Sequence, residues 1–147
     1  MSTSFIPDDF EVPRQFFGPG FHLEPLGPEH NERDHEAWMS SIEHIRSSPG
    51  MNFRSWPAPM SLEENLADME MHAREFEERK SFTYSILDGD EVIGCVYIYP
   101  GETSDSANVR SWVRESRAAM DTIVRESLDD WLREMWPFSQ IAYAVRH

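Results

Sequence analysis

The chain has 147 residues, 39% of them hydrophobic and 12% aromatic, which predicts one domain with its own apolar core. A formal net charge of −14 disfavours nucleic-acid and membrane-surface partners, and no stretch is apolar over the roughly 18 residues that a membrane span needs. A single cysteine, Cys95, excludes an intramolecular disulfide and suits a reducing compartment, so we expect a soluble cytoplasmic protein.

The first segment, residues 1–20, combines three prolines with four phenylalanines. Prolines at this density interrupt regular structure, whereas the rings need apolar contacts. We therefore expect an N-terminal arm that packs over a single domain of residues 21–147. The alternative is a segment that becomes ordered when it binds a partner. Residues 21–26 alternate apolar and polar side chains before Gly27 and Pro28, which predicts a short first strand.

Two helices are predicted next. Between residues 34 and 47, apolar side chains follow helical spacing at Trp38, Ile42 and Ile45, and Pro49 ends the pattern. Residues 61–79 begin with a capping box formed by Ser61 and Glu64. Their apolar stripe has 4-3-4-3 spacing and consists of Leu62, Leu66, Met69, Ala73 and Phe76.

The second half of the chain predicts a mixed sheet. Residues 82–87 and 91–99 are rich in β-branched and aromatic side chains and are joined by a short turn with a glycine, as in a β-hairpin. Residues 108–113 predict another strand, residues 120–135 an amphipathic helix, and residues 138–147 a last strand. The order β-α-α-β-β-β-α-β gives an α+β domain in which an antiparallel meander precedes a parallel strand-helix-strand unit.

This order of elements resembles the N-acetyltransferase (GNAT) superfamily of acyl-CoA N-acyltransferases over residues 21–146. The resemblance implies a GNAT-like mixed β-sheet flanked by helices, with a bulge in the fourth strand. In that family another helix and two strands follow, for which this chain has no counterpart. We therefore expect a shortened member or a homodimer in which a partner subunit covers the sheet edge.

The resemblance also implies acetyl-CoA as co-substrate. In the family, the fourth strand pairs with the pantetheine arm, and the turn after it binds the pyrophosphate. The positions that match here are Trp112, Val113, Arg114, Arg117, Ala118 and Ala119. Arg117 stands at the usual glycine, and Arg110, Arg114 and Arg117 form the most basic stretch of the chain. These arginines would bind an anion through their guanidinium groups or, alternatively, pair with the acidic side chains of residues 61–79.

The function that the resemblance implies is acyl-CoA-dependent acetyl transfer to a small amine or amino group. The candidate bases are Glu43, His44, Glu91 and Tyr97, and the candidate acceptor pocket contains Trp38, Phe53 and Trp56. The alternative is a non-catalytic GNAT-like module that binds a small ligand or a protein and has lost CoA binding. The six histidines do not follow a metal-ligand spacing, so we expect no metal.

Overall fold

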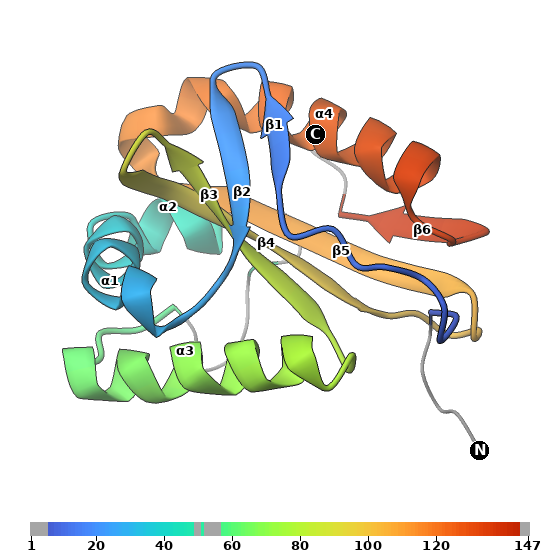
Figure 1. Cartoon of the computed structure of the whole chain (residues 1–147). Coiled ribbons are helices and arrows are strands. Elements are labelled where there is room, and N and C mark those ends of the chain that lie inside the picture. Colours follow the sequence, from blue (N-terminus) through green and yellow to red (C-terminus); the bar gives the residue numbers. More distant parts are fainter. Residues whose placement is uncertain (1–5, 49–50, 52–56, 145–147) are drawn as a thin grey trace.

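The computed structural model describes residues 6–48, 51 and 57–144, which form one mixed sheet with helices on both faces (Figure 1). The strands lie side by side in chain order, and each neighbouring pair is antiparallel except β5 and β6, which are parallel. Their bounds are β1 Phe16–Gly18, β2 Phe21–Pro25, β3 Phe82–Asp88, β4 Glu91–Pro100, β5 Ser106–Val113 and β6 Gln140–Tyr143. This confirms the predicted mixed sheet and its parallel strand-helix-strand unit.

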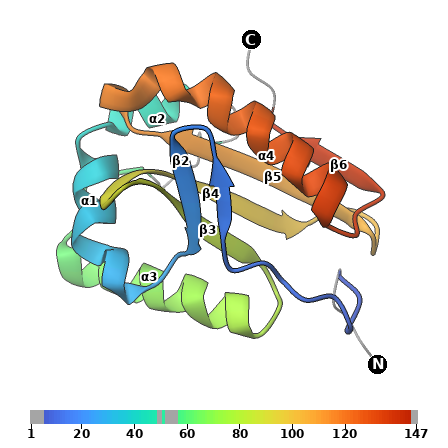
Figure 2. The same cartoon turned by 45° about the horizontal axis from the view of Figure 1, so that its top comes forward.

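The helices divide between the two faces of the sheet. Helix α4 covers one face, whereas α1, α2 and α3 lie on the other (Figures 1 and 2). Their bounds are α1 Asn31–Met39, α2 Ile42–Arg46, α3 Leu62–Glu77 and α4 Asp121–Met135, with 3₁₀ turns η1 Pro28–His30 and η2 Glu115–Met120. Because side chains alternate along a strand, β4 sends Val96 and Ile98 into the α4 core, whereas Cys95 and Tyr97 join the α1–α3 core.

The N-terminal segment contains a strand where the sequence predicts irregular structure. Residues 16–18, which lie between two prolines, form β1 and pair with β2, and Gly20 turns the chain with a φ of +81°. Before this strand, the side chain of Ile6 is buried in the α4 core. The Tyr84 hydroxyl also donates a hydrogen bond of 2.6 Å to the Pro13 carbonyl. This segment is therefore attached to the sheet by backbone pairing as well as by apolar contacts.

The helix predicted for residues 34–47 is divided into α1 and α2. The break lies at Ser41, which has φ −135° and ψ 22°. The Ser40 hydroxyl donates to the Ala37 carbonyl, and the Ser41 hydroxyl accepts a hydrogen bond of 2.8 Å from the Glu115 amide. Serine side chains compete in this way with helical backbone hydrogen bonds. Helix α3 is confirmed with its capping box.

The predicted hairpin is confirmed, and Gly89 in its turn has a φ of +60°. The pairing of β4 with β5 runs without interruption from Gly94 opposite Val113 to Pro100 opposite Ala107. The bulge that the resemblance implies for residues 108–113 is therefore absent from this pairing, and the register shift lies between Ile86 and Leu87 of β3. Strand β6 is shorter than predicted, and residues 145–147 of that prediction lie outside the described residues.

Candidate functional site

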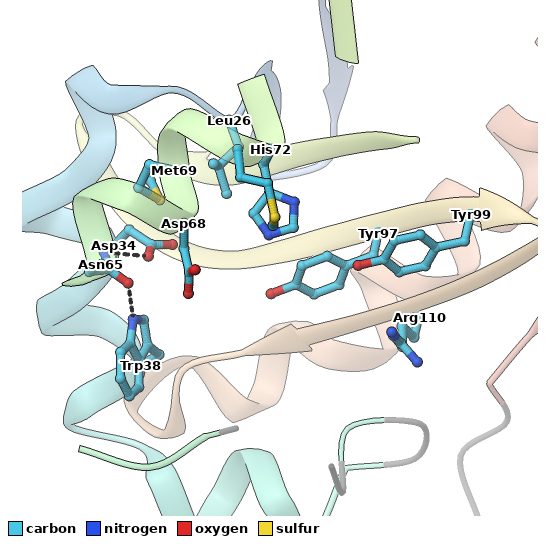
Figure 3. Close-up of a pocket in the computed structure, with 11 residues that line it drawn as sticks. Leu26, Asp34, Trp38, Asn65, Asp68, Met69, His72, Tyr97, Tyr99 and Arg110 are labelled. Atoms are coloured by element: carbon cyan, nitrogen blue, oxygen red, sulfur yellow. Dashed lines mark hydrogen bonds between the residues drawn. The ribbon is translucent and has the colours of Figure 1, made fainter. Parts of the chain in front are cut away.

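A cavity of about 240 Å³ lies between helices α1 and α3 and strands β4 and β5 (Figure 3). Polar side chains from all four elements line it, together with the indole of Trp38. These are Asp34 on α1, Asn65, Asp68 and His72 on α3, Tyr97 and Tyr99 on β4, and Arg110 on β5. The cavity thus brings acidic, basic and phenolic groups together among buried apolar side chains.

Asp34 is fixed at one end of this cavity by hydrogen bonds. Its Oδ2 accepts from the Asn65 amide at 3.2 Å, and its Oδ1 accepts from the Cys95 thiol at 3.4 Å. The Asn65 carbonyl in turn accepts from the Trp38 indole at 3.0 Å. Burial raises the pKa of Asp34 to about 6, against the opposing effect of these hydrogen bonds. The carboxyl therefore changes its charge near pH 6.

His72 and Tyr97 place a proton acceptor and a proton donor in the same cavity. The His72 ring lies 5.9 Å from the Tyr97 ring, and its Nδ1 lies 3.2 Å from the Thr83 hydroxyl. Burial lowers the pKa of His72, so the imidazole is neutral at pH 7. Burial also raises the pKa of Tyr97 well above its usual value, and its oxygen accepts from the Trp112 indole at 3.0 Å. The phenol therefore remains protonated.

Tyr99 and Arg110 form the opposite wall. The Tyr97 and Tyr99 rings are stacked with centroids 6.1 Å apart, and the Arg110 guanidinium lies 4.8 Å from the Tyr99 ring centre. Burial raises the pKa of Tyr99, while the hydrogen bond and charge of Arg110 oppose this shift. This wall therefore carries an aromatic face, a protonated hydroxyl and a positive charge.

A groove of about 380 Å³ shares this wall with the cavity. It lies where β5 and β6 meet, and Tyr99 and Arg110 line both spaces. The parallel pairing of the two strands covers Ser106–Val109 of β5, and the Ser111 and Tyr143 hydroxyls are 2.7 Å apart beyond it. The β6 side of the groove contains the small side chains Ala142 and Ala144. The geometry therefore places the groove directly beside the cavity.

The two arginines that follow β5 are held by carboxylates. Arg114 contacts Glu36 at 2.8 Å and Glu91 at 3.4 Å, and Arg117 contacts Glu91 at 2.7 Å and Asp88 at 2.9 Å. Three carboxylates thus balance two guanidinium groups. The alternative that these two arginines pair with the acidic side chains of residues 61–79 is wrong, because their partners come from α1, from the end of β3 and from the start of β4.

The other residues predicted to bind acetyl-CoA lie in contrasting environments. Trp112 is buried on the cavity side of β5, and Val113 is buried in the core on the α4 side. Ala118 and Ala119 are exposed within η2. The positions assigned by the resemblance therefore lie at the end of β5 and in the turn after it. The groove lies earlier in β5, at residues 108–110.

Of the four candidate bases, Tyr97 lines the cavity. Glu43 lies on α2, exposed and 3.5 Å from Arg46, and His44 lies on the same short helix. Glu91 contacts the two arginines described above. Among the predicted pocket residues, Trp38 lines the cavity, and Phe53 and Trp56 lie outside the described residues.

Sequence reasoning missed Asp34 and His72. The buried face of α3 contains Asn65, Met69 and Phe76, whereas Leu62 of the predicted stripe is 44% exposed. His72 lies three residues after Met69 and four before Phe76, so it belongs to the inward face. Asp34 likewise precedes Trp38 by one helical turn. The signal available in the sequence was a polar residue three or four positions away from a buried residue of the same helix, which places both on one face.

Within the described residues, no cluster of three or more potential ligands is arranged to hold a metal ion. None of the helices in the described part of the chain is long and apolar enough to span a membrane.

Comparison with known proteins gives matches in structure. No family model and no curated protein sequence matches the chain. The ribosomal-protein-S5-alanine acetyltransferase from Vibrio fischeri superposes with a TM-score of 0.61 at 11% identity, over 84% of this chain and 68% of that one. The microcin C7 self-immunity acetyltransferase MccE, in complex with acetyl-CoA and AMP, gives 0.65 at 13% identity, over 84% and 67%.

A third match is RimL, a ribosomal L7/L12 α-N-protein acetyltransferase in complex with coenzyme A. It gives a TM-score of 0.62 at 16% identity, over 83% of this chain and 67% of that chain. At these identities the likeness is one of fold, and it agrees with the strand order and the layers described above. The chain has the GNAT fold of the acyl-CoA N-acyltransferases.

Proposed function

We propose that the protein is an acyl-CoA-dependent N-acetyltransferase that acetylates a small amine. The observation that carries this proposal is the wall of Tyr99 and Arg110 between the cavity and the groove. An amine in the cavity and a thioester in the groove would meet at this wall. The fold supports the proposal, as do the complexes of MccE with acetyl-CoA and of RimL with coenzyme A.

The groove suits the pantetheine arm of acetyl-CoA. It lies along residues 108–110 of β5, and its other side contains the small side chains of Ala142 and Ala144 beside Tyr143. The diphosphate would lie toward Arg114 and Arg117, where the carboxylates of Glu36, Asp88 and Glu91 already occupy the guanidinium groups. A phosphate would have to replace these partners, so we expect acetyl-CoA to bind weakly, mostly through its pantetheine and acetyl groups.

Attack on the thioester requires the neutral amine, which has lost the additional proton of its ammonium form. When His72 donates its Nδ1 proton to the Thr83 hydroxyl, its Nε2 retains a lone pair that takes the amine proton. The nitrogen then bonds to the acetyl carbon, and the carbon–sulfur bond breaks. The departing sulfur takes a proton from Tyr99, which lines both spaces. The acetylated nitrogen then releases its surplus proton, which returns to the Tyr99 phenolate, so the products are the N-acetylated amine and coenzyme A, with the proton of the starting ammonium on His72.

The direct test is a calorimetric titration with acetyl-CoA and with coenzyme A, followed by measurement of thiol release with a panel of amines. Ala142→Phe would fill the groove, whereas the control Gln140→Phe places the same ring on the same strand outside it. We expect acetyl-CoA to bind the unmodified chain and Ala142→Phe to weaken binding by about tenfold or more, since a ring replaces the ligand's space. The control should bind as the unmodified chain does.

Two results would contradict the proposal. One is the absence of binding at millimolar acetyl-CoA, which would favour a non-catalytic module. The other is equal binding by both phenylalanine variants, which would move the ligand away from the groove. Thiol release that depends on an added amine would establish acetyl transfer, and a panel that includes peptides would distinguish small amines from protein amino groups.

A further inference from the structure

Asp34 is a buried carboxylate in the cavity wall whose charge is not balanced by an ion pair. It is 4% exposed, and it accepts hydrogen bonds from two neutral groups, the Asn65 amide and the Cys95 thiol. With a pKa of about 6, it is mostly ionised at pH 7. In the described part of the chain no arginine or lysine contacts it, and the charges that lower its pKa are those of two histidines. Because a buried charge is costly unless an opposite charge accompanies it, this carboxylate favours a cation in the cavity.

The two histidines that act on Asp34 are bound to other groups. The His30 Nε2 lies 2.9 Å from a carboxylate oxygen of Glu24. The His35 Nε2 lies 2.6 Å from the Met60 carbonyl oxygen. Neither of these described rings forms a hydrogen bond with Asp34, whose two oxygens each accept one hydrogen bond and can each accept another. The carboxylate therefore retains acceptor positions for a ligand that enters the cavity.

Asp34 and the wall shared with the groove lie at opposite ends of the cavity. The Tyr97 ring lies between Asp34 at one end and Tyr99 at the other (Figure 3). Leu26 adds apolar surface to the same lining. Cys95, whose thiol contacts Asp34, precedes Tyr99 by four residues on β4, so the two Cα atoms are about 13 Å apart. An aliphatic chain can therefore connect a group at Asp34 with a group at the shared wall.

We propose that the acceptor is an amine with a second positive charge at the far end of an aliphatic chain, and that this distal cation binds Asp34. The inference rests on the proposed acetyl transfer. The near nitrogen loses a proton to His72 and bonds to the acetyl carbon as coenzyme A leaves, whereas the distal nitrogen keeps its proton. A diamine thus gives a monoacetylated product with one cation. This product cannot place a cation at Asp34 and a free amine at the Tyr99 wall together, so its second acetylation should be slow.

Four amines with the same chain length isolate the distal charge. Hexamethylenediamine carries a distal cation, hexylamine a methyl group, ω-aminohexanol a hydroxyl group and ε-aminocaproate a carboxylate. At saturating acetyl-CoA, we expect the kcat/KM of hexamethylenediamine to exceed that of hexylamine and of ω-aminohexanol by at least about tenfold, and ε-aminocaproate to be the poorest acceptor. Hexylamine or ε-aminocaproate acting as well as the diamine would overturn the inference.

Three variants assign the preference to Asp34. Asp34→Asn removes its charge at nearly constant shape, so the ratio of kcat/KM for hexamethylenediamine to that for hexylamine should fall by at least about tenfold. Asp68→Asn should change this ratio less, because Asp68 is partly exposed and water screens its charge. The matched control is Asp130→Asn, which removes an exposed charge on α4, across the sheet, and should leave the ratio unchanged. A purely structural role of Asp34 would slow both amines equally, and an unchanged ratio in Asp34→Asn would overturn the inference.

A second readout separates failure of this inference from failure of the proposed function. The same four amines are titrated calorimetrically into the full chain in the absence of acetyl-CoA. If acetyl-CoA does not bind but hexamethylenediamine binds and Asp34→Asn weakens it at least about tenfold, the cation site holds and the transferase function fails. If all four amines are acetylated at equal rates, the function holds and this inference is overturned.

Discussion

Arg110 and Arg114 point to the same side of the sheet, because residues four apart on an extended chain share a face, yet their surroundings differ. The Arg110 guanidinium lies over the Tyr99 ring at the cavity wall. The Arg114 guanidinium contacts the carboxylates of Glu36 and Glu91. The contrast shows that two arginines of one basic stretch face different groups, an aromatic ring at the cavity wall for Arg110 and carboxylates for Arg114.

The two halves of the proposed site differ in the same way. The acceptor half has a cavity lined by polar and aromatic side chains, whereas the segment after β5 is held by ion pairs and by the hydrogen bond between the Glu115 amide and Ser41. We therefore expect recognition in this protein to depend more on the acceptor and the pantetheine arm than on the phosphates.

The largest expected effect concerns the cavity. His72→Gln removes the proton acceptor but retains a group that can hydrogen-bond to Thr83. We expect kcat for acetyl transfer to fall by about 10²–10⁴-fold, the usual contribution of a general base, with acetyl-CoA affinity unchanged. Steady-state rates and calorimetry measure the two quantities. His44→Gln on α2 is the control and should retain the activity. Equal losses in the two variants would exclude His72 as the base.

The next effect is a pH dependence of stability. The pKa of Asp34 is raised from 3.8 to about 6 on folding. The folded chain therefore binds more protons than the unfolded chain between these values, and the free energy of unfolding falls as pH rises from about 4 to 6. This group contributes a change of roughly 3 kcal/mol. Urea unfolding of the unmodified chain and of Asp34→Asn, from pH 4 to 7, should show this slope in the unmodified chain. If the free energy of unfolding changed with pH in the same way for both proteins, Asp34 would not be the group responsible for the slope.

A smaller effect concerns the ion pairs after β5. The Arg114 side chain is 11% exposed, but its partners are more exposed, so Arg114→Met should lower the free energy of unfolding by about 1 kcal/mol. Arg133→Met removes an exposed pair with Asp129 on α4 and should cost less than about 0.5 kcal/mol. Urea titrations at one pH compare the two. A larger loss for Arg133→Met would mean that the Arg114 pairs do not support the fold.

The smallest expected effect distinguishes two roles for Glu91. If Glu91 competes with the diphosphate for Arg117, Glu91→Gln should tighten acetyl-CoA binding by roughly threefold at low salt, and the gain should diminish as salt screens the charges. Asp88→Asn is the companion variant, because Asp88 pairs with the same arginine. Loss of acetyl transfer at unchanged affinity would instead identify Glu91 as the base, as the sequence allowed.

Much of the fold could be predicted because its elements have long periodic patterns. The hairpin of β3 and β4 and the stripe of α4 are examples. Strand β1 was missed because three residues are too short to establish an alternation. The break between α1 and α2 depends on the hydrogen bond from the Glu115 amide to Ser41, which connects positions 74 residues apart. Local patterns contain no information about such a contact.

The site was predicted less completely for the same reason. Trp38 and Tyr97 were proposed and line the cavity. Asp34 and His72 lie on different helices, and together with Asn65 and Asp68 they follow no recognised motif spacing, so the sequence did not single them out. Arg114 and Arg117 stood out as a basic stretch, but their carboxylate partners come from Glu36, Asp88 and Glu91, which are distant in sequence. Only the fold shows that these charges are balanced.

The most direct test of the central claim is a backbone amide NMR titration of the full chain with acetyl-CoA. If the thioester lies in the groove beside the cavity, the largest shifts should occur at residues 108–113, at Ala142–Ala144 and at Tyr99. Shifts confined to residues 114–120, or no shifts at millimolar acetyl-CoA, would contradict the claim that the groove and the cavity form one acetyl-transfer site.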